Sequence, residues 1–173
     1  SVTYRTEMLR ESGMVLPKHT FYVDNLFVYE PLPYVKTIYY LNVDYYRYYI
    51  GREGQSVAEQ TMIKRIDQQF AVNYRLIEGC DVWSIEEPNL RNYMLSFLEM
   101  ITVVSTCLGY LSGTDENLQK VKDLWNHIKD VNPRTYRHIR FGVFGNAMKI
   151  PGKVGRKMAL KAYHLSQKYM GFN

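Results

Sequence analysis

Residues 19–57 hold the side chains whose types and order could do chemistry. Asp24 lies between aromatic residues and begins a short apolar run, DNLFVYEPL. Arg52, Gln55 and Ser56 follow in the glycine-flanked loop GREGQSV. A carboxylate within reach of a hydroxyl can act as a base, and a guanidinium binds anionic groups. Together these residues predict a site that holds an anionic ligand near a base.

Each of these side chains also has a purely structural interpretation. Asp24 suits a helix N-cap, where free backbone N–H groups and the positive end of the helix dipole stabilise a carboxylate. Arg52 could pair with Glu53 at the surface. Ser56, with Glu59 three residues later, predicts a capping box at the start of the following helix.

The elements expected to position these groups are two strands and two short helices. VKTIYYLN (residues 35–42) and VDYYRYYI (residues 43–50) are rich in β-branched and aromatic residues, which suit a pleated, half-buried surface. The helix that follows Asp24 must end before Pro31. Residues 3–12 predict a short strand and a short helix that ends at Gly13. We therefore expect an α+β unit over residues 1–57.

Residues 58–173 predict a mostly helical unit of about four helices. Apolar residues spaced three or four apart indicate a long amphipathic helix from residue 57 to about 80. The most apolar stretch, residues 88–111, approaches the length of a membrane span. Glu99 near its middle would be costly in a bilayer, so we expect a buried core helix. Thr114 predicts the N-cap of a third helix, and a basic helix closes the chain.

The charged residues are distributed unevenly along the chain. The net charge is +5, yet residues 131–173 hold nine Lys and Arg and no acid. This one-sided charge suits either a solvated helix or an anionic surface such as phospholipid head groups. No recognition fold accompanies the charge, so nucleic-acid binding is not expected. The two cysteines have no metal-ligand spacing with the histidines, and they suit unpaired residues in a reducing, cytoplasmic compartment.

A family resemblance extends this interpretation. FYVDN, YVKTIYYL, YYRYYIGREGQSV and MIKRIDQQ together resemble the C-terminal portion of bacterial family 2 glycosyltransferases, above all those that build capsular and other cell-surface polysaccharides. The similarity is dense over residues 3–70 and thin beyond. It implies the acceptor-side half of a GT-A fold, with the nucleotide-binding half and its Asp-x-Asp metal motif upstream of Ser1. The chain is accordingly expected to be part of a longer enzyme and inactive alone.

The resemblance also implies roles for the candidate residues. Family members carry an acidic pair whose Asp removes a proton from the acceptor hydroxyl during an inverting transfer, and this sequence has Val23-Asp24 in its place. Asp24 is therefore the expected base. Arg52 is the expected neutraliser of the leaving diphosphate, with Gln55 and Ser56 in the same donor or acceptor loop. The parent enzyme is expected to use Mn²⁺ or Mg²⁺, and no metal ligand is expected in this chain.

The expected partners follow from the same reasoning. They are a nucleotide-sugar donor and a glycan or lipid-linked acceptor, with an anionic membrane surface facing residues 134–168 at the inner face of the membrane. The alternative is a non-catalytic helical module that dimerises or docks the enzyme to a membrane. Exposed apolar area on the two long helices would favour that alternative.

Overall fold

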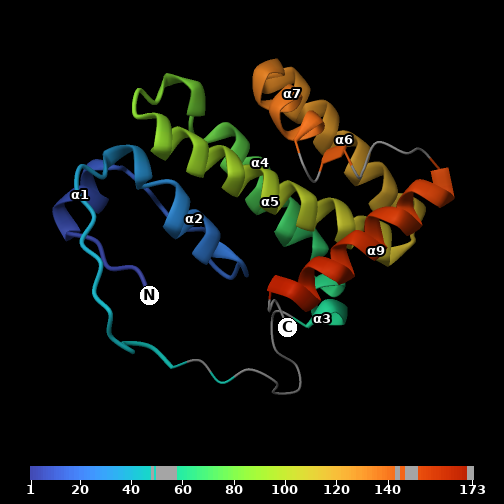
Figure 1. Ribbon diagram of the computed structural model, residues 1–173, viewed down its shortest axis with the longest axis horizontal. Coiled ribbons are helices and arrows are strands. Elements are labelled where there is room, and N and C mark those ends of the chain that lie inside the picture. Colours follow the sequence, from blue (N-terminus) through green and yellow to red (C-terminus); the bar gives the residue numbers. More distant parts are fainter. Residues whose placement is uncertain (48, 50–57, 143–144, 147–151, 171–173) are drawn as a thin grey trace.

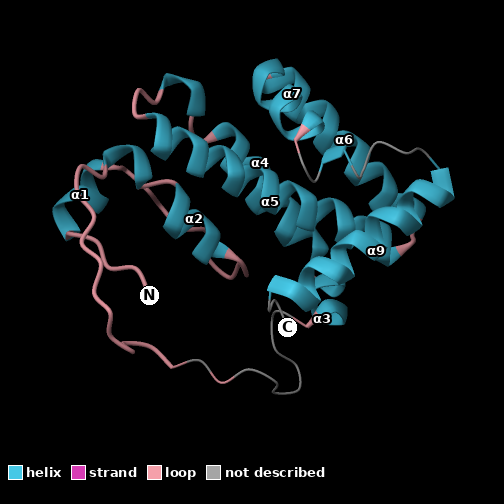
Figure 2. Cartoon of the chain, viewed as in Figure 1, coloured by secondary structure: helices cyan, strands magenta, loops and turns pink. Residues whose placement is uncertain are grey.

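The computed structural model describes residues 1–47, 49, 58–142, 145–146 and 152–170, and the side chains of 153, 162 and 165–170 are not described. Helices joined by loops make up this part of the chain, and no strand occurs in it (Figures 1 and 2). The helices are α1 (Thr6–Glu11), α2 (Val23–Tyr29), α3 (Glu59–Lys64), α4 (Ile66–Glu78), α5 (Pro88–Ser112), α6 (Asp115–Val131), α7 (Pro133–Phe141) and α9 (Gly152–Met170). Two short 3₁₀ turns, η1 (Leu32–Tyr34) and η2 (Val82–Ser84), follow α2 and α4.

The predicted α+β fold is therefore wrong, because the described chain is all-helical. The error lies in the two runs expected to be strands. Residues 35–47 and 49 form no ladder with any described segment and run outside the helices (Figure 1). Strand propensity reflects packing on a pleated surface beside a partner strand, and the described chain offers these residues no such partner. The strand predicted within residues 3–12 is also absent, whereas α1 forms and Gly13 follows it with a positive φ, as expected.

The core lies between α4, α5 and α6. The apolar residues that predicted one helix from 57 to 80 do face inward, but the helix is interrupted at Arg65, whose backbone leaves helical geometry between α3 and α4. The core includes these buried side chains: Phe70, Leu76, Met94, Leu98, Leu108, Leu124 and Ile128. Among the described helices, α5 is long and apolar enough to cross a membrane, but its inward face is buried in this core, as predicted for a core helix.

A buried polar network crosses the same core. The side-chain amides of Gln69 and Asn73 on α4 donate to Ser105 Oγ on α5, at 3.2 and 3.0 Å. Trp125 Nε1 on α6 donates to Thr106 Oγ1 on α5 at 3.2 Å. Polar groups buried away from water are costly unless they are paired. These bonds therefore favour one alignment of the three helices over others that apolar contacts alone would permit.

Helix ends follow the expected capping chemistry in the second half of the chain. Thr114 Oγ1 accepts from Asn117 N and caps α6, as predicted. Pro88 occupies the first turn of α5, and Gly113 ends that helix in the left-handed region.

Outside the main core, α9 packs on another face of α5 through a small cluster around Cys107 and Ala159. Both cysteines are free.

Candidate functional site

Asp24 lies at the surface in the first turn of α2. Its side chain is exposed and has no hydrogen-bond or ion-pair partner among the described residues. The N-cap of α2 is Tyr22, and no side chain caps the helix. The purely structural interpretation of Asp24 as an N-cap is therefore wrong. The carboxylate is accessible and lies in the first turn of a short helix.

The chain enters α2 through a constrained turn. His19 (φ 54°) and Tyr22 (φ 66°) both occupy the left-handed region, which non-glycine residues adopt at a cost of about 1 kcal/mol or more each. Contacts from the α3–α4 junction hold this turn in place. Phe21 N donates to Gln68 Oε1 at 2.7 Å, and the Arg65 guanidinium lies 3.5 Å from the centre of the Phe21 ring. The backbone that presents Asp24 is thus fixed by residues more than forty positions away.

Three polar groups gather at this turn. Burial raises the pKa of the Tyr22 phenol, the nearby Arg65 guanidinium opposes that rise, and the Asp24 carboxylate adds to it. Asp24 and Arg65 therefore both lie close enough to Tyr22 to act on it electrostatically. We call Phe21, Tyr22, Asp24, Arg65 and Gln68 the α2 entrance site. It places an exposed carboxylate beside a phenol and a guanidinium, which are groups able to hold a hydroxylated or anionic ligand.

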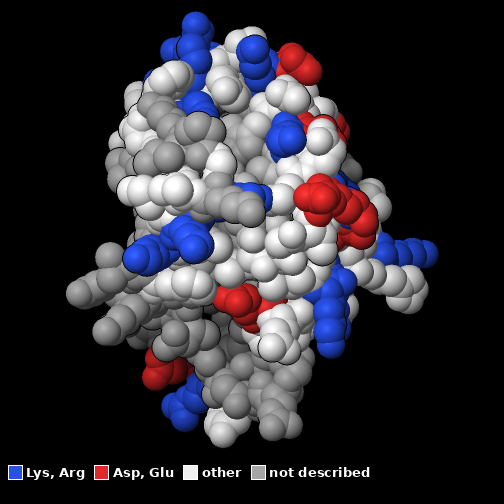
Figure 3. All heavy atoms as spheres, turned by 90° about the vertical axis from the view of Figure 1, so that its right-hand side faces the viewer, with Lys and Arg blue, Asp and Glu red and all other residues white. Residues whose placement is uncertain are grey.

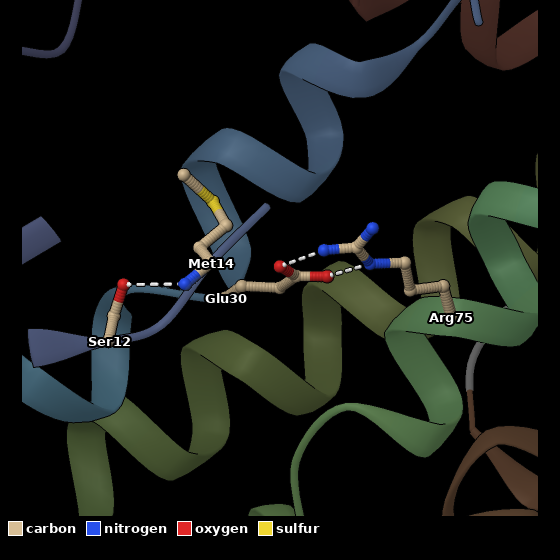
Figure 4. Close-up of polar contacts among 4 residues, drawn as sticks. All are labelled: Ser12, Met14, Glu30 and Arg75. Atoms are coloured by element: carbon tan, nitrogen blue, oxygen red, sulfur yellow. Dashed lines mark hydrogen bonds and ion pairs between the residues drawn. The ribbon is translucent and has the colours of Figure 1, made fainter. Parts of the chain in front are cut away.

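The far end of α2 is fixed by a two-bond ion pair. Arg75 Nε and Nη2 on α4 donate to the two carboxylate oxygens of Glu30 at 2.5 and 2.7 Å (Figure 4). This bond raises the pKa of Arg75. Leu26 and Tyr29 on α2 are fully buried in the main core. Because the turn before α2 is held by Arg65 and Gln68 and its far end by Arg75 on α4, α2 is a fixed support for Asp24.

The other predicted site residues, Arg52, Gln55 and Ser56, lie outside the described residues, so their place relative to Asp24 stays a prediction. The capping box is wrong, since α3 begins at Glu59 with Ala58 as its N-cap and no side chain caps it. Arg65 and Gln68 were not among the candidate residues chosen from the sequence. No local signal marks their role, because it arises only where α2 packs against α4.

A hollow lies between α5, α6 and α7, away from the α2 entrance site, with a volume of about 340 Å³. It is lined by Tyr110, Val121, Lys122, Trp125, Asn126, Tyr136 and Arg140. The Arg140 guanidinium lies 5.3 Å from the Trp125 ring centre, and the Tyr136 ring meets Trp125 edge-on. Rings and cations around one hollow suit a ligand that is both anionic and partly apolar. Asp24 does not line this hollow.

The face shown in Figure 3 carries both basic and acidic side chains among the described residues. Lys and Arg side chains are interspersed there with Asp and Glu. Residues 131–173 contain no acid, so the acids on this face belong to the rest of the chain. The anionic-surface role of residues 134–168 stays a prediction.

The described residues do not assemble a metal site. No three His, Cys, Asp or Glu side chains among them lie close enough together to hold an ion. The His127 ring lies against the Tyr74 ring, with Nε2 2.8 Å from Glu78 Oε1, and His138 lies edge-on to Trp83. We therefore assign no chemical step to a metal bound by these residues.

Comparisons with family models, curated proteins and solved structures found no match to the chain.

Proposed function

We propose that the chain is the acceptor-side part of an inverting glycosyltransferase that resembles family 2, with Asp24 as its base. One observation carries this proposal. Asp24 is an exposed carboxylate, without a partner among the described residues, on a helix that is held at both ends. Two structural roles of a surface aspartate, capping a helix and joining an ion pair, are not formed by Asp24 among the described residues, which leaves its interaction with the helix dipole as its structural role.

The chemistry follows from the weak nucleophilicity of a sugar hydroxyl. In the proposed step the Asp24 carboxylate takes the hydroxyl proton of the acceptor while the hydroxyl oxygen attacks the anomeric carbon of the donor sugar. The bond from that carbon to the nucleoside diphosphate breaks, and the diphosphate leaves with the bonding electrons. Arg52 is proposed to neutralise the charge that develops on the diphosphate. Gln55 and Ser56 are proposed to belong to the same loop.

The constrained turn before α2 supports this assignment. Left-handed non-glycine residues persist where surrounding contacts force them, and such positions cluster at functional sites. His19 and Tyr22 both precede Asp24 by five residues or fewer. Arg65 and Gln68 contact Phe21, which lies between His19 and Tyr22. The two left-handed residues destabilise the fold, and in return they set the direction in which α2 begins. A base needs such a fixed position, because proton transfer requires hydrogen-bond reach.

The test is Asp24→Asn in the complete polypeptide that contains this chain, assayed for sugar transfer over a panel of nucleotide sugars with Mn²⁺ present. We expect transfer to fall about 100-fold or more, with nucleotide binding and thermal stability nearly unchanged. Asp115→Asn is the matched control, because Asp115 is also an exposed acid in the first turn of a helix. Normal transfer by Asp24→Asn would refute the role of Asp24 as base.

A non-catalytic interaction module is the second candidate function. The distribution of exposed apolar residues indicates through which segment it would interact. The helices formed by the two stretches predicted as long helices, α3 and α4 in the first and α5 in the second, expose few large apolar side chains, namely Tyr93 and Met100 on α5. Docking through these helices is therefore not favoured. The exposed apolar residues gather instead in the extended chain after η1, which favours an interaction through that segment.

An anionic membrane surface remains the proposed partner of residues 134–168. Sedimentation with anionic but not neutral lipid vesicles is the expected result. Equal, weak binding to both would contradict it.

A further inference from the structure

The extended segment, which we define as residues 35–45, exposes more large apolar side chains than any helix among the described residues. It includes six large apolar residues whose exposed fractions range from 62% to 85%: Ile38, Tyr39, Tyr40, Leu41, Val43 and Tyr45. A single exposed apolar side chain is ordinary, but a contiguous run of this size marks an interaction surface. The segment runs apart from the helices (Figure 1).

The order of residues in the segment gives it two different faces. In an extended chain, alternate side chains point to opposite faces. The odd-numbered positions are Val35, Thr37, Tyr39, Leu41, Val43 and Tyr45. The even-numbered positions include Lys36, Asn42 and Asp44. One face would therefore be apolar and the other mixed, which is the pattern of an extended segment covered on one side.

The backbone of the segment is also available for pairing. Its hydrogen bonds among described residues are short-range ones, from Val35 N to Leu32 O, from Val43 N to Leu41 O and from Tyr45 N to Val43 O, at 2.9–3.0 Å. The last two would be replaced on pairing with another extended chain. Such a chain would satisfy the remaining N–H and C=O groups in a regular ladder.

We propose that this segment binds the same segment of a second copy, antiparallel and centred on Tyr40. In this register Lys36 of each copy lies opposite Asp44 of the other, so two opposite-charge pairs form. Val35 lies opposite Tyr45, Thr37 opposite Val43, and Tyr39 opposite Leu41, which keeps the apolar faces together. The interface is a two-fold one, in which both copies use the same surface.

Charge selects this register over its neighbours. Moving the centre to Tyr39 places Lys36 opposite Asn42, and moving it to Leu41 places Asp44 opposite Ile38. Neither neighbour pairs the two charges. A centre between two residues would place the apolar face of one copy opposite the mixed face of the other. The register centred on Tyr40 is therefore the one that matches both charge and polarity.

The first experiment is sedimentation velocity on the 173-residue chain with a charge-exchange series. We expect a dimer whose dissociation constant rises about tenfold in Lys36→Asp and in Asp44→Lys, because each change turns two attractive pairs into repulsive ones. The double variant Lys36→Asp, Asp44→Lys restores the pairs and should recover wild-type dimerisation. A monomer at all accessible concentrations, or a double variant no better than the singles, would overturn the proposal.

Cysteine cross-linking tests the register directly, in a Cys80→Ser background with the buried Cys107 retained. Tyr40→Cys lies opposite itself and should form a disulfide-linked dimer rapidly. Asn42→Cys is the control, since its two copies would be about 14 Å apart along the paired segments, too far for a disulfide. Equal cross-linking of the two variants would refute this register. Circular dichroism verifies that each variant is folded, and neither experiment depends on the proposed transferase activity.

Discussion

A close contact between α5 and α6 at Gly109 gives the sharpest prediction about stability. Gly109 on α5 is buried against α6, and a Cβ added there would lie 2.3 Å from Val121 Cγ2 and 3.3 Å from Asn117 O. Carbon atoms in contact prefer about 3.5–4.0 Å. Val121 is buried and β-branched, so its side chain has little freedom to turn away. Gly109→Ala therefore forces α6 to move by roughly 1 Å relative to α5.

Two opposing terms set the size of this effect. Alanine gains about 1 kcal/mol over glycine in a helix, whereas overpacking a core costs about 1–3 kcal/mol or more. Because Val121 and the backbone of α6 are both in the way, we expect the larger cost and a net loss of about 2 kcal/mol. This corresponds to a Tm lower by about 4–8 °C. Urea unfolding followed by circular dichroism measures the free energy.

A double-mutant cycle separates the clash from other effects. Val121→Ala removes the obstructing methyl groups and alone should cost about 2 kcal/mol. In the double variant the new Cβ of residue 109 fills part of that space, so the two losses should be less than additive by about 1–2 kcal/mol. Ser96→Ala, on the exposed face of α5, is the control and should change stability by less than about 0.5 kcal/mol. A Gly109→Ala variant as stable as the wild type would refute the reasoning.

Two further predictions concern buried polar groups of α5. Ser105→Ala leaves the amides of Gln69 and Asn73 without their shared acceptor and should cost about 1–3 kcal/mol; a loss no larger than that of Ser96→Ala would contradict this. Burial raises the pKa of Cys107 to about 12 from an ordinary value near 9. The native thiol then keeps its proton where the unfolded thiol loses it, so stability is complete below pH 9 and falls by about 1.4 kcal/mol per pH unit between pH 9 and 12. Unfolding at pH 8, 9 and 10 should show this extra slope in the wild type and not in Cys107→Ala; parallel curves would refute it.

Much of the helical part could be predicted from the sequence because its signals are local. The period of the apolar residues marked α4, α5 and α6, Thr114 marked the start of α6, and Gly113 follows the end of α5. These features depend on neighbours within one or two turns, so a single chain is enough to read them. The interruption at Arg65 was not predicted, because the residues around it are good helix formers.

The candidate site could also be predicted from the sequence only in part. Asp24 could be selected from the sequence by its residue type and surroundings. Its environment could not, since Arg65 and Gln68 contact Phe21 in the turn before Asp24 only because α2 packs against α4. Likewise, Lys122, Trp125 and Arg140 meet in one hollow because α6 and α7 pack side by side.

By itself, the sequence determined where most helices lie and which of their faces are apolar. The tertiary structure decided whether the extended segment has a partner, and among the described residues it has none in its own chain. The physical reason is the range of the hydrogen bonds. A helix satisfies its backbone groups within four residues, whereas a strand needs a second segment whose presence no local pattern can reveal.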